Sequence, residues 1–501
     1  MTINEAAKKL AEIEKKEIAY QHASGILYYD GVTGAPAGTA ENRGETLAIL
    51  SEAEYLLSTG EETTKVVEFL FAHKDELDPK TRRDVELKYK NINELKKIPM
   101  EEYVAYTRLL NESESVWHKA KEENDYASFA PYIDKIVETQ KRFASLVAPE
   151  KDPYDYQLDS FEEGLTKEKC ETFFAALSRE IVPLVKKVTA AKQVDDSLNQ
   201  KLYPVAVQEK LSDELMAFMK IDRDHCMIGT TEHPFTTGFT KYDVRITTHY
   251  HEDNFLSSLF SVVHEGGHAL YELGVSDDLT YTGLGGGVSM GVHESQSRFY
   301  ENIIGRSEAF AKLVFPTLQR LFPEQTKGAD AHSLWLAANK SEPSLIRTEA
   351  DELTYALHIM VRYEIEKKLF AGEVTSKDLP ELWAKLYKDY LGIDVPDDKQ
   401  GVLQDSHWSG GLFGYFPSYA LGSAYGAQLL LKMGEDFDVF AAVENNEMEK
   451  VNSWLRERIW QYGCLYKPTE LMEKVFEKPF DPTYFTEYLK KKYTAIYGIE
   501  A

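Results

Sequence analysis

Apolar residues recur at helical spacing along almost the whole chain, and this periodicity limits the fold more than any other feature. The chain begins with Thr2 and Glu5 at capping-box spacing, followed by apolar residues at helical intervals. Asp78-Pro79 and Asp481-Pro482 each place an N-cap residue before a proline at a first helical position, and each precedes a new periodic run. The pattern predicts an all-α, mainly helical protein.

One stretch, residues 227–250, departs from the helical pattern because it is rich in Thr, Phe, Tyr, Val and Ile. Such residues favour strands, so we expect a small sheet or β-hairpin there. The stretch ends directly before the metal-type motif described below, where an edge strand could bind a peptide backbone by strand addition. A hairpin that only covers a helical core fits the composition equally well.

The chain has 501 residues, 43% of them hydrophobic, and can bury a large core without disulfides. Its length alone would allow about three domains. No Gly/Ser-rich linker, low-complexity tract or fixed-period repeat marks a boundary, however. We therefore expect a single domain over residues 1–501.

The net charge of −26 disfavours binding to nucleic acid or to anionic membranes, because both are polyanions. The sequence contains no run of about 18 apolar residues, and the N-terminus lacks the apolar region of an export signal. We therefore expect a cytoplasmic protein with no membrane or nucleic-acid partner. Cys170, Cys226 and Cys464 are far apart and odd in number, so reduced thiols are expected.

The most informative motif is His264-Glu265-Gly266-Gly267-His268. Two histidines four residues apart share one face of a helix and can bind one metal ion. A glutamate beside the first histidine can act as general base on a metal-activated water. Two core histidines with satisfied hydrogen bonds are the structural alternative.

The motif lies in the middle of a predicted buried helix that Asn254 would cap and Gly274 would end. Gly266 and Gly267 each cost such a helix about 0.8–1 kcal/mol relative to alanine. Their presence suggests that a substrate or a second helix passes close to the backbone.

A catalytic zinc usually takes three protein ligands, so a third must be found. Tyr271 and Gly274 occupy positions that exclude the metzincin extension. Glu272 lies eight residues after His264, about 12 Å along the helix axis, which is too far to share an ion. Glu294 and His293 remain as alternatives on a following helix, beyond the flexible glycine run of residues 283–287.

Several separated motifs together resemble the thermostable-carboxypeptidase (Taq-carboxypeptidase-like) family of zinc metallocarboxypeptidases over essentially the full length. In chain order they are His233-Pro234-Phe235, Asp243-Val244-Arg245-Ile246-Thr247, the His264–His268 motif, His293-Glu294-Ser295-Gln296-Ser297-Arg298, the run from Ile346 to Tyr355, and Gly401-Val402-Leu403-Gln404-Asp405-Ser406-His407-Trp408.

The resemblance implies a mainly helical fold related to neurolysin and angiotensin-converting enzyme, with two lobes flanking a deep groove. It assigns His264, His268 and Glu294 as ligands of one zinc ion per chain, with cobalt a candidate substitute. It also implies homodimers that release residues one at a time from peptides with a free C-terminus, with broad preference and poor action on proline.

Two tyrosines are candidates for stabilising the oxyanion that peptide hydrolysis generates. In Gly414-Tyr415-Phe416-Pro417-Ser418-Tyr419-Ala420-Leu421-Gly422, the tyrosines look like the tyrosine segment of the neurolysin group. We favour Tyr419, then Tyr415. Aromatic core packing is nearly as plausible in a chain with 30 tyrosines.

An exopeptidase must also hold the substrate's terminal carboxylate, for which a bidentate arginine is suited. Arg347 and Arg245 lie in the family motifs, and Arg347 is preferred. On a helix, Arg347 would share a face with Asp351, so a structural ion pair competes with a binding role. His233 and His407 are candidates for binding substrate or orienting zinc ligands, although each could be a buried loop histidine.

Two other functions compete with a carboxypeptidase. A zinc oligopeptidase would use the same metal chemistry on internal bonds. A non-catalytic helical metal-binding protein would keep the histidines, but it would have no use for Glu265 between them.

Overall fold

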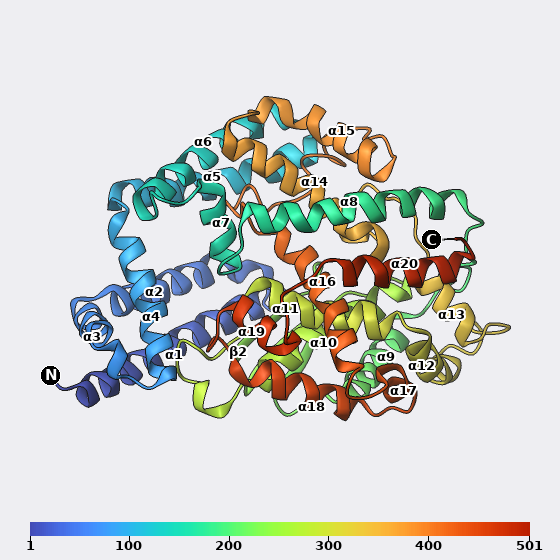
Figure 1. Cartoon of the computed structure of the whole chain (residues 1–501), viewed down its shortest axis with the longest axis horizontal. Helices are drawn as coiled ribbons and strands as arrows, with labels where there is room; N and C mark the ends of the chain where they lie inside the picture. The colour runs from blue at the N-terminus through green and yellow to red at the C-terminus, as the bar shows by residue number, and fades with distance from the viewer. Residues whose placement is uncertain (501) are drawn as a thin grey trace.

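The computed structural model describes residues 1–500 and is built mainly from helices (Figure 1). The α-helices are α1 (Ile3–Thr33), α2 (Ala40–Thr59), α3 (Glu61–Ala72), α4 (Pro79–Lys97), α5 (Met100–Glu123), α6 (Tyr126–Val147), α7 (Pro153–Phe161), α8 (Lys167–Ala190), α9 (Val205–Phe218), α10 (Phe255–Gly274), α11 (Met290–Arg298), α12 (Glu308–Leu321), α13 (Ala331–Ala338), α14 (Glu352–Ala371), α15 (Leu379–Leu391), α16 (Phe416–Met433), α17 (Val439–Glu444), α18 (Met448–Arg458), α19 (Pro468–Phe476) and α20 (Thr483–Tyr497). The predicted helical class is confirmed.

The site-bearing helices lie in the middle of the molecule, with the N-terminal helices to one side (Figure 1). Helices α1, α3 and α4, blue in the figure, share a small core of their own that includes Leu10, Val67 and Leu70. Helix α11 packs against both α10 and α16 in the centre. The two-lobed division around a groove stays a prediction.

The strand-like stretch forms a three-stranded sheet of β1 (Cys226–Thr230), β2 (Thr236–Thr240) and β3 (Asp243–Thr248). Strand β3 lies in the middle, parallel to β1 and antiparallel to β2. Val244 and Ile246 of β3 are fully buried, and α10 packs against both β2 and β3. The expected small sheet therefore lies directly against the helix that carries the histidine motif, with β2 as an outer strand.

Helix α10 ends at Gly274 as predicted, and a Cβ atom at this position would lie 2.6 Å from the Trp460 side chain, so only glycine fits there. Its start also lies where predicted, directly after Asn254, but the predicted capping hydrogen bond does not form. The Asn254 side chain makes no capping hydrogen bond and instead accepts one from Asn199. The side-chain oxygen of Asn199 accepts from the backbone N–H of Leu256, so a residue distant in sequence serves the helix start.

The two glycines of the motif lie against different neighbours: a Cβ atom on Gly266 would meet the Met219 side chain at 2.7 Å, and Gly267 faces a second helix. A Cβ atom on Gly267 would lie 2.8 Å from both the carbonyl oxygen of Gln296 and the Cα of Ser297, on α11. On the other side of α11, a Cβ atom on Gly422 of α16 would lie 2.6 Å from the side chain of Glu294. A second helix thus passes close to the α10 backbone, one of the two explanations that the sequence offered.

None of the helices within residues 1–500 combines the length and the apolar character needed to cross a membrane. The three cysteines are free thiols, as expected, with Cys170 and Cys226 buried and Cys464 partly so.

Candidate active site

His264 and His268 lie one turn apart on α10 and face Glu294 of α11. The Nε2 atoms of His264 and His268 lie 3.7 and 3.5 Å from Oε2 of Glu294. One donor atom from each of the three residues lies within 4.8 Å of the other two. The structure therefore brings together the three residues that the sequence motifs singled out as ligands.

The hydrogen bonds around the histidines leave these donor atoms facing one another. The Nδ1 atom of His264 lies 2.8 Å from Oε2 of Glu301, and that of His268 lies 2.6 Å from Nδ1 of His293. Both Nδ1 atoms are thus engaged, while both Nε2 atoms point toward Glu294. Two imidazole nitrogens and one carboxylate form a donor set that suits a catalytic zinc and leaves a coordination position open. These residues therefore fit a metal ion.

His293, the alternative third ligand, has neither ring nitrogen free. Its Nδ1 meets His268 and its Nε2 lies 2.7 Å from Oε1 of Glu272. The geometry therefore favours Glu294 over His293.

Arg298 keeps the carboxyl groups of Glu294 and Glu301 ionised. Its Nε donates to Oε1 of Glu294 at 2.6 Å, and its Nη1 donates to Glu301 at 3.1 Å. Burial alone would raise the pKa of each carboxyl, but Arg298 and the histidines hold both pKa values well below the usual range. Burial also lowers the pKa of His268 to about 4, so its imidazole is neutral at pH 7. Ionised carboxylates and a neutral imidazole are the forms that bind metal.

Glu265, the proposed base, is buried and tied to the sheet. The hydroxyl of Thr236 on β2 lies 2.6 Å from Oε2 of Glu265 and 3.0 Å from its carbonyl oxygen. Burial raises the pKa of Glu265 above its ordinary value. A carboxyl with a raised pKa is better matched to accepting and returning a proton near neutral pH.

The predicted tyrosines lie together beside His407. The Tyr419 hydroxyl is 3.2 Å from Nε2 of His407, and the rings of Tyr415 and Tyr419 are 5.1 Å apart. Burial raises the pKa of both phenols, which keeps them protonated as hydrogen-bond donors. Burial lowers the pKa of His407 to about 4.

Arg347 is connected to the ligand cluster through a tyrosine. The Tyr355 hydroxyl accepts from Nη1 of Arg347 at 3.1 Å, and the Cζ of Arg298 lies 4.1 Å from the centre of the Tyr355 ring. The guanidinium of Arg347 also lies 4.9 Å from the Tyr419 ring centre. Contacts therefore run without a break from Glu294 through Arg298 and Tyr355 to Arg347.

The alternative role of Arg347, a structural ion pair with Asp351 on a common helix, is wrong. Arg347 lies in the short turn η5 (Arg347–Glu349), before α14 begins, and its Nη2 pairs with Asp405 at 2.9 Å. Asp351 caps α14 by accepting from the backbone N–H groups of Leu353 and Thr354. The strong capping preference of aspartate starts the helix after it, which leaves Arg347 outside the helix.

The other two predicted binding residues lie apart from the ligand cluster. Arg245 pairs with Asp243 at 2.9 Å and stacks on Tyr29 of α1 and Phe239. It faces away from the buried side of β3. His233 is exposed in the connection between β1 and β2. Within residues 1–500, no hydrogen bond or ion pair joins either residue to His264, His268 or Glu294.

Sequence reasoning missed the residues that support the ligands. Glu301, which binds His264, lies on a π-helical turn, η4 (Phe299–Gly305), that directly follows α11. Arg298 lies in the His293–Arg298 motif, but its role in holding Glu294 was not predicted. Thr236 entered the prediction only as part of the strand composition of residues 227–250. Glu301 and Thr236 reach the site from a π-helical turn and a strand, so local spacing carries no signal for them, whereas the four-residue spacing of Glu294 and Arg298 on α11 is a local signal for their ion pair.

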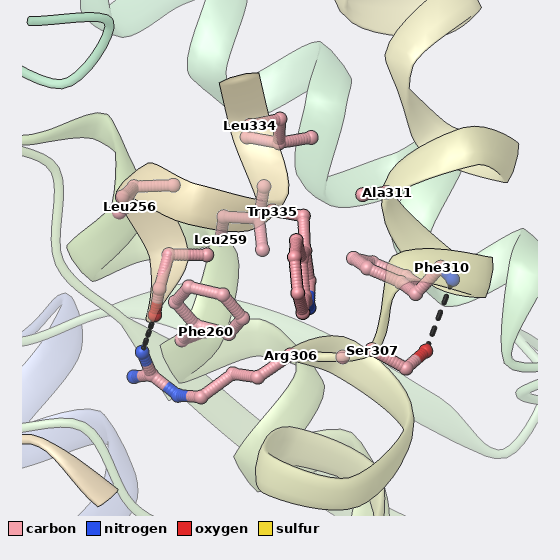
Figure 2. Close-up of a pocket in the computed structure, with 11 residues that line it drawn as sticks. Leu256, Leu259, Phe260, Arg306, Ser307, Phe310, Ala311, Leu334 and Trp335 are labelled. Atoms are coloured by element: carbon pink, nitrogen blue, oxygen red, sulfur yellow. Dashed lines mark hydrogen bonds between the residues drawn. The ribbon is translucent and has the colours of Figure 1, made fainter. Parts of the chain in front are cut away.

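A small apolar cavity lies farther toward the start of α10 (Figure 2). It holds about 10 Å³ and is lined by Leu256, Leu259, Phe260, Phe310 and Trp335, among others. A cavity of that size holds at most about one water molecule, so it is not a substrate site. Arg306 also lines this cavity, and its Cζ lies 3.9 Å from the centre of the Phe260 ring. The guanidinium of Arg306 forms an ion pair with Glu301 at 3.3 Å.

Comparison with known proteins agrees with this geometry. The model of the family described as carboxypeptidase Taq (M32) metallopeptidase matches residues 9–493. Carboxypeptidase 1 of Bacillus subtilis (strain 168) is 40% identical over 99% of this chain and 100% of its own length. Thermostable carboxypeptidase 1 of Thermus thermophilus is 36% identical over the same shares.

Solved structures give the same result. The crystal structure of the M32 carboxypeptidase from Deinococcus radiodurans R1 superposes with a TM-score of 0.96 at 33% identity, covering 99% of this chain and 100% of that one. The resemblance inferred from the sequence motifs is confirmed. The chain therefore belongs to the carboxypeptidase Taq (M32) family of metallopeptidases and is a metallocarboxypeptidase.

Proposed function

We propose that this protein is a zinc carboxypeptidase that releases single residues from the C-terminus of peptides. The observation that carries the proposal is the convergence of two histidine Nε2 atoms on Oε2 of Glu294, beside a buried Glu265. His264, His268 and Glu294 would hold the ion. When bound there, zinc would supply Lewis-acid chemistry to a water molecule and to the scissile carbonyl.

Glu265 supplies the proton transfers. Its carboxylate accepts a proton from the attacking water and then donates it to the leaving amine. The hydrogen bond from Thr236 limits the rotation of this carboxylate, so that one oxygen stays available for the water. Tyr419, with Tyr415 beside it, donates a hydrogen bond to the oxyanion that forms on the carbonyl.

Arg347 is proposed to anchor the terminal carboxylate of the peptide. A guanidinium has five N–H groups. Nε donates one to Asp405, Nη1 donates one to Tyr355, and Nη2 lies in an ion pair with the same Asp405 oxygen at 2.9 Å. One N–H therefore remains on each of Nη1 and Nη2, which suits a bidentate carboxylate. Arg245 is the second candidate, and His407 and His233 are proposed to contact the rest of the substrate.

The family resemblance supplies the remaining parts of the proposal. They are a homodimer, a groove between two lobes within residues 1–501, broad preference and poor action on proline. A cytoplasmic location is proposed because the sequence shows no export signal. The strongly negative charge of the chain also disfavours nucleic acid as a partner.

One experiment separates this function from its competitors. The protein is tested on three substrates: an N-blocked dipeptide, a longer peptide with a free C-terminus, and the C-terminally amidated form of that peptide. Each substrate is incubated with the untreated protein, with the protein plus chelator, and with the protein after zinc is restored. A carboxypeptidase releases free amino acids from the first two, spares the amide and stops with chelator. Cleavage of the amidated peptide at internal bonds would instead indicate an oligopeptidase, and no cleavage at all would indicate a binding protein.

A further inference from the structure

The glycine run of residues 283–287 has a specific contact with the site. The backbone N–H of Gly287 donates to Oε1 of Glu272 at 3.2 Å. A Cβ atom on Gly287 would lie 2.4 Å from Cδ2 of His293 and 3.0 Å from its Nε2. Only a glycine at this position leaves room for the His293 ring where it lies.

When His268 binds metal, the hydrogen bonds determine which ring nitrogen of His293 carries the proton. Metal binding through Nε2 places the proton of a neutral His268 on Nδ1. That Nδ1 then donates to Nδ1 of His293, 2.6 Å away. His293 must accept there, so its own proton lies on Nε2 and is donated to Oε1 of Glu272, 2.7 Å away.

We infer that Glu272, His293 and Gly287 together hold His268 in the tautomer and ring orientation that present Nε2 to the metal. We call these contacts the His293 link. Glu272 cannot share the ion, because it lies eight residues from His264, about 12 Å along the helix axis, and the imidazole of His293 connects it to His268 instead. His264 is held differently, by the carboxylate of Glu301 directly. The inference rests on the proposed metal site.

A purely space-filling role of His293 would predict a different effect of its substitution on metal binding. The His293 ring also lies 5.0 Å from the ring of Tyr271, so it fills space as well as forming hydrogen bonds. If filling space were its whole role, variants that keep its volume but lose one hydrogen bond would bind metal normally.

The glycine run provides a matched pair of variants. Neither Gly286 nor Gly287 has a positive φ, so alanine strains neither backbone. Gly287→Ala would push the His293 ring away, whereas a Cβ atom on Gly286 meets nothing closer than 3.8 Å, at Oε2 of Glu272.

Zinc affinity is measured by competition with a chromophoric chelator, and the melting temperature of the metal-free protein is measured in parallel. We expect Gly287→Ala to weaken zinc binding about 10–100-fold, and Gly286→Ala to leave it unchanged.

Two substitutions of His293 separate its two hydrogen bonds. The carboxamide of asparagine lies near the position of Nδ1, and that of glutamine lies near Nε2. His293→Asn should therefore retain part of the zinc affinity by accepting from His268, while His293→Gln should lose it. The visible spectrum of the cobalt-loaded protein should change in His293→Gln and in Gly287→Ala, because the ligand geometry changes.

Wild-type zinc affinity and cobalt spectra in both Gly287→Ala and His293→Gln would overturn the inference while leaving the proposed function in place. Equal losses in His293→Asn and His293→Gln would also overturn it, since a space-filling role would not distinguish them. If the wild-type protein binds no zinc in the same titration, the proposed metal site fails first, and the inference fails with it.

Discussion

The hydroxyl of Thr236 lies 2.6 Å from Oε2 of Glu265, so the outer strand of the sheet holds the carboxylate of the proposed base. The same hydroxyl lies 3.0 Å from the Glu265 carbonyl oxygen, and its single proton serves one acceptor at a time. This contact gives the small sheet a role in positioning the site.

Thr236→Val should reduce kcat for an N-blocked dipeptide about tenfold or more, because a hydrogen bond to a charged group contributes about 1.5–3 kcal/mol. KM should change little, since Thr236 supports the base. Thr236→Ser keeps the hydroxyl and should restore most of the rate. Equal activity of the valine and serine variants would contradict this role.

Glu265→Gln should retain zinc and lose hydrolysis by about 10²–10⁴-fold, because an amide cannot accept the proton of the attacking water. Atomic absorption checks that zinc is retained, and turnover of the N-blocked dipeptide checks that hydrolysis is lost. Full activity in this variant would remove Glu265 as the base.

Arg347→Lys should raise KM about 10–100-fold for peptides with a free C-terminus, as expected when a charge-assisted contact worth about 1.5–3 kcal/mol is lost. The fold should survive, because Asp405 remains paired with Arg362 at 2.6 Å. Arg245→Lys serves as the comparison. A large increase in KM for Arg245→Lys with no change for Arg347→Lys would instead identify Arg245, on β3, as the residue that binds the terminal carboxylate.

Gly267→Ala should lower the melting temperature, because the added Cβ atom would press on the α11 backbone at 2.8 Å. Overpacking of this kind costs about 1–3 kcal/mol, which exceeds the gain of about 1 kcal/mol in helix propensity. Gly44→Ala on α2 is the control, since a Cβ atom there meets nothing within 4 Å. That variant should be slightly more stable than wild type, and similar behaviour of the two would contradict the packing explanation.

Glu14 should make stability depend on pH. Burial, with the nearby Asp84 carboxyl adding to it, raises the pKa of Glu14 far above its ordinary 4.5, although Lys88 opposes the shift. The folded state therefore binds a proton that the unfolded state releases, and stability falls as the pH rises from 4.5 toward the folded pKa.

Glu14→Gln imitates the protonated carboxyl, so its melting temperature should fall less than that of wild type between mildly acidic and mildly alkaline pH. The exposed Glu12 on the same helix provides the control, and Glu12→Gln should follow the wild-type curve. Parallel curves for Glu14→Gln and wild type would show that this carboxyl does not contribute.

The sequence by itself determined the features that depend on local spacing. Helical periodicity predicted the helices, β-branched and aromatic composition predicted the sheet, and a four-residue interval placed His264 and His268 on one face. The adjacency of Glu265 to His264 and the end of α10 at Gly274 are equally local.

Only the tertiary structure decided which residues from other elements reach that face. Glu294 and Glu301 come from α11 and the π-helical turn after it, and their approach depends on how closely α11 packs on Gly267. Thr236 comes from β2, which packs directly on α10. The alternative that Arg347 pairs with Asp351 on one helix was wrong for a related reason, since Asp351 caps α14 and Arg347 lies before that helix begins. Distances between elements are set by the packing of side chains across their interfaces, and intervals along the chain do not encode them.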